Sequence, residues 1–116
     1  GFRFSENRGK VMENMVAVEL MRRRGDDSEL YYWKGVRDQE VDFVIKKGEE
    51  ISQLIQVSAI SEEIDIRKRE IRSLLKAYKE TDCEDLLIIT DDLELEKEFD
   101  GVNIRLVPLW KWLLTD

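Results

Sequence analysis

The segment that decides the fold runs from Glu40 to Ser58 and reads EVDFVIKKGEEISQLIQVS. Two stretches rich in β-branched and apolar residues flank a turn that contains Gly48, a pattern typical of a β-hairpin. We predict strands over Gln39–Lys46 and Ile51–Ile60. With the turn centred on Glu49, Asp42 lies directly opposite Gln56, and cross-strand side chains at such positions are roughly 5 Å apart.

Asp42 stands out in this hairpin because the strand around it is apolar. Side chains alternate between the two faces of a strand, which predicts two sets on opposite faces: Val41, Phe43 and Ile45 on one, and Asp42, Val44 and Lys46 on the other. On the next strand, Gln56 and Ser58 share a face. A buried carboxylate needs hydrogen bonds, a cation or a shifted pKa. Asp42 is therefore either a ligating residue or a strand-end residue paired with a nearby Lys or Arg, and both interpretations stay open.

Further elements are predicted on both sides of the hairpin. Upstream we expect a helix over Lys10–Arg24 and a strand over Glu29–Lys34. Downstream we expect, in order, an amphipathic helix over Glu62–Glu80, a buried strand over Leu86–Thr90, a short helix over Leu93–Phe99, a strand over Val102–Val107 and a helical turn over Leu109–Leu114. The order αβββαβ(α)βα predicts one α/β domain over residues 1–116, with a central mixed sheet of four to five strands flanked by helices.

The first predicted helix carries apolar residues around most of its circumference. Such a helix is usually buried on most sides, which in a chain of 116 residues suggests contact with something beyond this domain. Glu13 falls on an apolar side of the helix, where an unpaired carboxylate is unfavourable. It is either a partner of Asp42 in a magnesium site or a charged residue that interrupts an apolar helix surface and so limits non-specific association. Glu19 is the other candidate for the acidic residue on this helix, but Arg22 and Arg23 are placed to neutralise it.

Composition excludes several classes of chemistry. The chain has no histidine and one cysteine, which rules out Ser-His and Cys-His nucleophiles, His-ligated zinc and thiolate metal clusters. Its 26 acidic and 19 basic residues give a net charge of −7, which disfavours non-specific binding to polyanions. The sequence has no apolar run long enough to span a bilayer, and a single cysteine fits a reducing compartment. We therefore expect a cytoplasmic protein without a membrane partner.

The residues quoted above resemble the core of the PD-(D/E)XK nucleases. The resemblance is carried by Glu13 on a first helix, Val41-Asp42-Phe43-Val44-Ile45 on a second strand and Leu54-Ile55-Gln56-Val57-Ser58 on a third. With Gly9-Lys10-Val11-Met12-Glu13-Asn14, Leu30-Tyr31-Tyr32-Trp33 and the terminal Val107-Pro108-Leu109-Trp110-Lys111-Trp112-Leu113-Leu114, the chain is similar to the C-terminal domain of unknown function in predicted archaeal and bacterial AAA+-type ATPases. This implies a restriction-endonuclease-like fold and an N-terminal P-loop ATPase domain in the same polypeptide.

The resemblance also implies roles for four residues, two of which depart from the nuclease pattern. Asp42 matches the motif aspartate and Glu13 the helix acid, so these two would hold Mg²⁺ or Mn²⁺ in an active member. Gln56 stands at the position of the second metal-binding acid and Ser58 at that of the lysine. An amide is a weaker ligand than a carboxylate, and a hydroxyl supplies no positive charge. Lys46 is a candidate to supply the motif lysine from a different position in the sequence.

Two functions from different classes follow from this interpretation. The favoured one is a non-catalytic accessory or interaction domain of an ATPase, which contacts its own ATPase domain and either another protein or DNA. The alternative is a divalent-metal-dependent DNA nuclease with a remodelled site. A basic run at the start of the second long helix is a candidate DNA contact, set against the simpler interpretation of a solvated helix face: Arg67, Lys68, Arg69 and Arg72.

Overall fold

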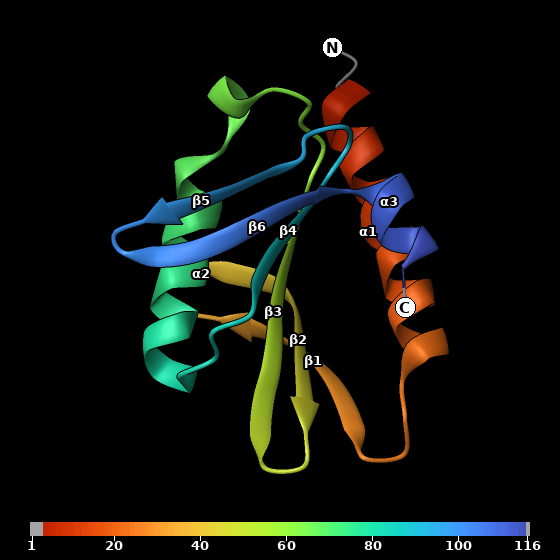
Figure 1. The fold of residues 1–116 in the computed structure, drawn as a ribbon, viewed down its shortest axis with the longest axis vertical. Coiled ribbons are helices and arrows are strands. Elements are labelled where there is room, and N and C mark those ends of the chain that lie inside the picture. Colours follow the sequence, from red (N-terminus) through yellow and green to blue (C-terminus); the bar gives the residue numbers. More distant parts are fainter. Residues whose placement is uncertain (1–3, 116) are drawn as a thin grey trace.

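The computed structural model describes residues 4–115, and the side chains from residue 7 onward. The elements along the chain are α1 (Phe4–Arg23), β1 (Ser28–Lys34), β2 (Glu40–Lys47), β3 (Glu50–Ser58), a 3-10 turn (Glu63–Asp65), α2 (Lys68–Thr81), β4 (Leu86–Thr90), β5 (Leu95–Phe99), β6 (Val102–Pro108) and α3 (Leu109–Leu114). The predicted α/β class is confirmed (Figure 1).

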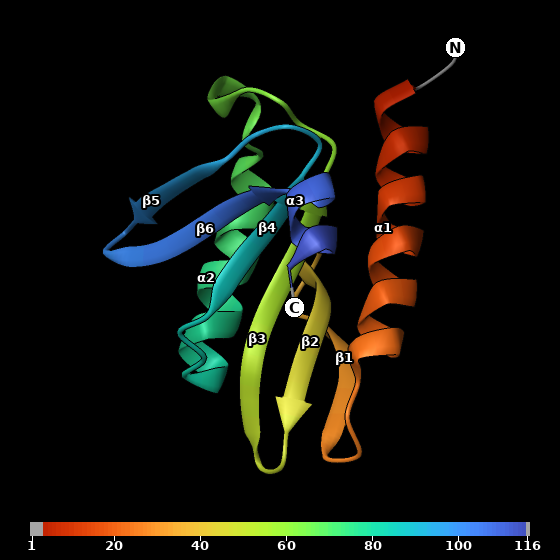
Figure 2. The same ribbon diagram turned by 45° about the vertical axis from the view of Figure 1, so that its right-hand side comes forward.

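The molecule has three layers, with one six-stranded mixed sheet between helices. The strand order is β1-β2-β3-β4-β6-β5. β3, β4 and β6 run parallel to one another, and the remaining neighbours pair antiparallel. Helix α2 crosses over from β3 to β4 on one face, and α1 and α3 cover part of the other face (Figures 1 and 2). This arrangement places the N-terminal half of α1 and the start of α2 on opposite sides of the same sheet region.

Two apolar clusters hold the layers together. Between α2 and the sheet, one cluster includes Leu74, Leu54 and Ile88, all at most 1% exposed. Between α1, α3 and the sheet, the other includes Val16, Ile55, Leu87 and Trp112. β4 is buried along its whole length, as expected of a central parallel strand. Burial of apolar surface on both faces of the sheet is the main stabilising contribution to such a fold.

Three predicted elements differ from the structure by more than the one or two residues seen at the ends of the other strands. α1 begins at Phe4 rather than Lys10. α2 begins at Lys68 rather than Glu62, because a separate 3-10 turn precedes it. The helix predicted over Leu93–Phe99 is wrong, because Leu95–Phe99 forms strand β5 at the edge of the sheet, paired antiparallel with β6. Its addition gives the sheet six strands instead of four to five.

A helix that crosses a bilayer needs about 20 predominantly apolar residues, and the described helices fall short of this. None of those within residues 4–115 is both long and apolar enough to cross a bilayer.

Candidate functional site

Asp42 lies at a β-bulge in β2. Along the β1–β2 pair, Tyr31 is opposite Val44 but Trp33 is opposite Val41, so two steps on β1 match three on β2. A bulge of this kind inserts one residue and re-aims the side chains next to it. The predicted alternation is therefore wrong for Val41, which packs in the same cluster as Val44 on the α2 side of the sheet, while Phe43 packs on the α1 side.

The predicted hairpin register holds from Phe43, which pairs with Ile55, to Ile45, and it shifts by one residue between Ile45 and Lys46. Continued past Phe43, the register brings Asp42 opposite Gln56. The two side chains nevertheless do not face each other as a carboxylate and an amide ligand. The Val57 backbone N–H donates a 2.8 Å hydrogen bond to Asp42 Oδ2. The Asp42 backbone N–H donates to Gln56 Oε1 at 3.0 Å. The carboxylate thus turns to the backbone of β3.

Gln56 uses both ends of its amide to bind backbone groups. Besides the bond that its Oε1 accepts, its Nε2 donates to Glu40 O at 2.8 Å and to Glu70 O at 3.3 Å. The side chain is 2% exposed. It therefore bridges β2, β3 and the first turn of α2 at the bulge. The regular β2–β3 pairing ends at Phe43 and Ile55, so Gln56 lies just beyond it. Buried backbone groups need such partners.

Acidic side chains from three different elements lie near enough to the bulge to influence one another electrostatically. Burial raises the pKa of Asp42 to about 8, and the nearby Glu13 carboxyl on α1 and Glu70 on α2 also raise it, against the lowering effect of the Val57 N–H. Burial likewise raises the pKa of Glu70, although Arg67 and Arg69 oppose the shift. Burial and the neighbouring carboxyls therefore favour the protonated form of Asp42.

Sequence reasoning missed two residues of this site. Glu70 lies far from Asp42 along the chain, and only the packing of α2 brings it in. Lys10, one helical turn before Glu13, lines the same hollow of about 230 Å³ together with Asp42, Glu70 and Arg67. The one available signal was the i,i+3 spacing of Lys10 and Glu13, which puts both on neighbouring positions of a helix.

The other predicted residues lie in different surroundings. Ser58 is 1% exposed, and its hydroxyl faces Glu70 without a hydrogen bond of standard geometry. Lys46 lies beyond a second irregularity in β2, where it pairs with Ile51, and it does not line the hollow beside Asp42.

The basic run on α2 does not form one patch. Arg67 and Arg69 border the hollow beside Asp42, and Arg69 pairs with Asp38 at 3.5 Å. Lys68 and Arg72 instead line a separate groove between α2 and the β5–β6 hairpin. A DNA backbone contact that uses all four cations at once would have to span two surfaces.

The donor set does not fit a divalent metal ion in this conformation. Gln56 has no free ligand atom directed at Asp42, since its amide is committed to backbone groups. Within residues 4–115, no three carboxylate or other ligating side chains are grouped to hold a metal ion.

Comparisons with known proteins place this geometry in context. The family model described as Domain of unknown function (DUF4143) matches residues 8–112. The uncharacterized protein MJ1544 of Methanocaldococcus jannaschii is 40% identical over 118 aligned residues, which cover 97% of this chain and 26% of that protein. The chain thus spans about a quarter of the length of this curated relative.

Among solved structures, a chain of the Thermococcus gammatolerans assembly of McrB AAA+ hexamers with bound McrC is similar in fold. It superimposes with a TM-score of 0.57 and 16% identity, over 86% of this chain and 27% of that chain. At this identity, the likeness concerns the fold alone.

Proposed function

Because this chain belongs to the DUF4143 family, whose members share a domain of unknown function, we propose its role from its own geometry: a restriction-endonuclease-like domain without metal-dependent cleavage, which acts as an accessory interaction module of an ATPase. The observation that carries the proposal is the use of Gln56. At the position where a nuclease of the resembled type has a metal-binding acid, this side chain joins β2, β3 and α2 through backbone hydrogen bonds.

The charge state of the bulge supports the same conclusion. Metal-assisted phosphodiester cleavage needs ionised carboxylates that hold the cation and a group that activates water. Here Asp42 has a pKa of about 8, and a buried hydroxyl stands at the lysine position. These residues stabilise a protonated, hydrogen-bonded junction of β2, β3, α1 and α2.

An exposed apolar stripe on α1 supports an interaction role. Its outer face, away from the sheet, carries four apolar side chains that are 43% to 70% exposed: Val11, Met15, Val18 and Met21. They recur at helical spacing on one side of the helix. Contiguous exposed apolar surface of this kind marks contact with a partner, and it agrees with the contact beyond the domain predicted from the sequence.

Association with an ATPase rests on two comparisons. The relative MJ1544 is about four times as long as the region that this chain matches, which leaves room for further domains. The structural neighbour comes from an assembly of AAA+ hexamers. We propose that the partner domain is an ATPase domain N-terminal to this one in the same polypeptide.

Titration with Mg²⁺ or Mn²⁺ tests the loss of metal chemistry. We expect no binding heat at pH 7 for the parent chain, because binding would require ionisation of Asp42 and release of its bond to the Val57 N–H. The measurement is isothermal calorimetry beside an Asp42→Asn control. Saturable binding below about 1 mM in the parent, absent from the control, would refute the proposal and place a metal at Asp42.

A metal-dependent DNA nuclease remains the second candidate, and one observation favours it. Ser58 has a buried hydroxyl without a hydrogen-bond partner, directed at the acidic junction. The variant Gln56→Glu/Ser58→Lys restores the motif, and we expect it to leave DNA uncut in Mg²⁺ and Mn²⁺ because the amide bridge is lost. Cleavage of linear or branched DNA by this variant, but not by its Asp42→Asn derivative, would show that the scaffold retains a catalytic arrangement.

A further inference from the structure

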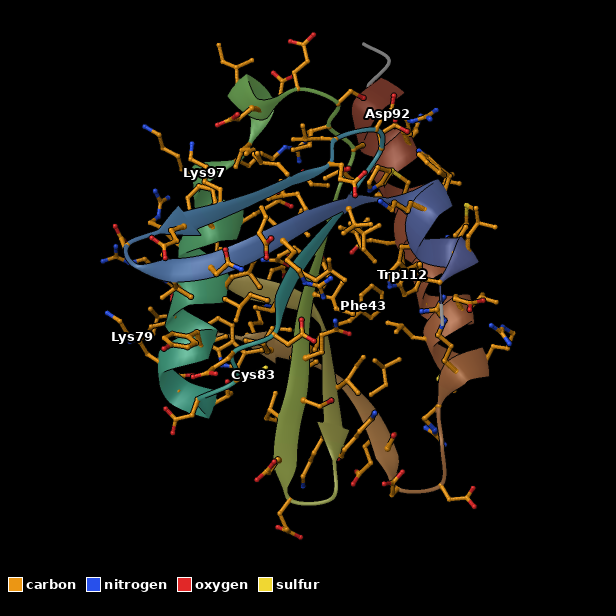
Figure 3. All side chains as sticks on the ribbon, in the orientation of Figure 1. Phe43, Lys79, Cys83, Asp92, Lys97 and Trp112 are labelled. Atoms are coloured by element: carbon orange, nitrogen blue, oxygen red, sulfur yellow. The ribbon has the colours of Figure 1, made fainter. Side chains whose placement is uncertain are left out.

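A second cavity, lined in part by Trp112, shares no lining residue with the hollow beside Asp42. It has a volume of about 430 Å³ and opens between the C-terminal end of α1, the first residues of β1, the hairpin of β2 and β3, and α3. Its lining combines apolar residues with cations: Leu20, Leu30, Ile45, Trp112, Arg22, Arg23, Arg24 and Lys47, with Ser28, Glu29 and Gln53. In Figure 3, Trp112 lies on the α1 side of the sheet, opposite to Lys79 on α2.

The charge of this cavity is opposite to that of the whole chain. Four cationic side chains and one carboxylate line it, although the chain carries a net charge of −7. The carboxylate, Glu29, already accepts a hydrogen bond from the Tyr31 hydroxyl. Arg24 and Lys47 have no ion pair among the described residues. Concentrated positive charge at one hollow of an acidic protein favours an anionic ligand.

The cavity walls are fixed by contacts within the fold. The Arg23 guanidinium stacks over the Trp112 ring at 4.4 Å from its centroid and donates to the Trp112 carbonyl at 2.9 Å. Glu19 holds both Arg22 and Arg23 with ion pairs of 2.6 Å. These bonds fix the wall and occupy donors of Arg22 and Arg23, so Arg24 and Lys47 are the lining cations best placed to meet an anion.

The hairpin that closes the cavity is anchored as well. The Gly48 backbone N–H, at the β2–β3 turn, donates to Asp27 O at 3.1 Å, and Ser28 pairs with Lys47 across β1 and β2. These contacts join the loop after α1 to the turn after β2 and fix the backbone of Lys47 beside the cavity. The arrangement is a preformed hollow, as ligand sites usually are.

We propose that this cavity binds a phosphomonoester with an apolar, preferably aromatic, body. The volume suits a small molecule, and the floor of Leu20, Leu30 and Ile45 accommodates an apolar group. A dianionic head balances Arg24 and Lys47, the two lining cations without an ion pair among the described residues, better than a carboxylate does. The guanidinium of Arg24 has the geometry to pair with phosphate through two parallel hydrogen bonds. The inference is independent of the proposed loss of nuclease chemistry, because it involves none of the residues at the Asp42 junction.

Titration with phenyl phosphate, followed by ¹⁵N–¹H NMR of the 116-residue chain at pH 7.5, tests the proposal. We expect saturable shifts at the amides of Ser28, Lys47 and Gln53 and at the Trp112 indole, with a Kd of roughly 1 mM. Inorganic phosphate and benzoate each lack one recognised feature, so each should bind about tenfold more weakly.

Charge-reversal variants distinguish an effect of the cavity cations from an effect of the overall charge of the protein. Arg24→Glu/Lys47→Glu changes two exposed residues at the rim and should weaken phenyl phosphate binding by at least about tenfold. Lys76→Glu/Lys79→Glu makes the same change in charge on the exposed side of α2 and should leave the affinity within about twofold. The inference fails if phenyl phosphate leaves the cavity signals unchanged, if inorganic phosphate binds equally well, or if both double variants lose affinity equally.

Discussion

Gln56→Glu is expected to lower the free energy of unfolding by about 3–5 kcal/mol at pH 7. The substitution keeps the shape of the side chain but replaces the donor Nε2 with an acceptor oxygen. That oxygen then faces the carbonyls of Glu40 and Glu70, which Nε2 contacts at 2.8 and 3.3 Å. A carboxylate at a position that is 2% exposed also joins the acidic junction at Asp42. Unfolding in guanidinium, followed by circular dichroism, measures the loss.

Gln53→Glu is the matched control for this effect. Gln53 lies on the same strand, is partly buried and makes no side-chain hydrogen bond among the described residues. The same change there should cost no more than about 1 kcal/mol. Equal losses in the two variants would show that Gln56 is not a structural bridge. A ligand stabilises the folded state measurably only when its concentration exceeds its Kd. If about 10 mM Mg²⁺, an excess over a millimolar Kd, restored the free energy of unfolding of Gln56→Glu, the result would instead reveal a metal site.

Asp42→Asn is expected to raise the free energy of unfolding at pH 7 by about 2–4 kcal/mol and to flatten its dependence on pH. Burial raises the pKa of Asp42 from 3.8 to about 8, so between these values the folded chain keeps a proton that the unfolded chain has released. Each pH unit in this window therefore costs stability, on the order of 1 kcal/mol. The loss is absent below about pH 4 and complete above about pH 8. The amide that replaces the carboxyl group in this variant stays neutral throughout and still offers an oxygen to the Val57 N–H.

Denaturant unfolding at intervals between about pH 4 and pH 8 measures this slope. The curves of the parent and of Asp42→Asn should meet near the lower limit and diverge as the pH rises. Asp38→Asn removes a carboxylate whose side chain is 70% exposed, so it should leave the slope of the parent unchanged. A variant Asp42→Asn that is less stable than the parent at pH 7 would mean that the junction stabilises the ionised carboxylate.

The sequence predicted those parts of the fold whose pattern is local. Leu86–Thr90 forms a strand with the predicted bounds, because an uninterrupted apolar run suits a strand buried on both faces. The hairpin register was correct only from Phe43 to Ile45, because a β-bulge between Ile45 and Lys46 offsets a turn that lies one position from the predicted one. The segment Leu95–Phe99 was assigned wrongly because Glu96, Lys97 and Glu98 lack the apolar content of a strand. Pairing with β6 at the sheet edge overrides that local preference.

The candidate site could be predicted only in part. Asp42 and Glu13 were found because carboxylates stand out among apolar neighbours, and the structure brings them together. Glu70 could not be found this way, because its approach depends on how α2 packs. The bulge was invisible as well, since one extra residue leaves the composition of β2 unchanged and reverses the alternation of every residue before it. Both features determine which way Gln56 turns.

The strand order described above also has a consequence for how the chain folds. β1, β2 and β3 are neighbours both in sequence and in the sheet, and so are β5 and β6. Each group can therefore pair across short turns, and closing such short loops costs little conformational entropy. β4 has no such neighbour in sequence: it reaches β3 only after the α2 crossover and joins β6 across the intervening β5. Such non-local pairings are the slow events of folding. We therefore expect the pairings of β4, the strand buried along its whole length, to form after the hairpins on either side of it.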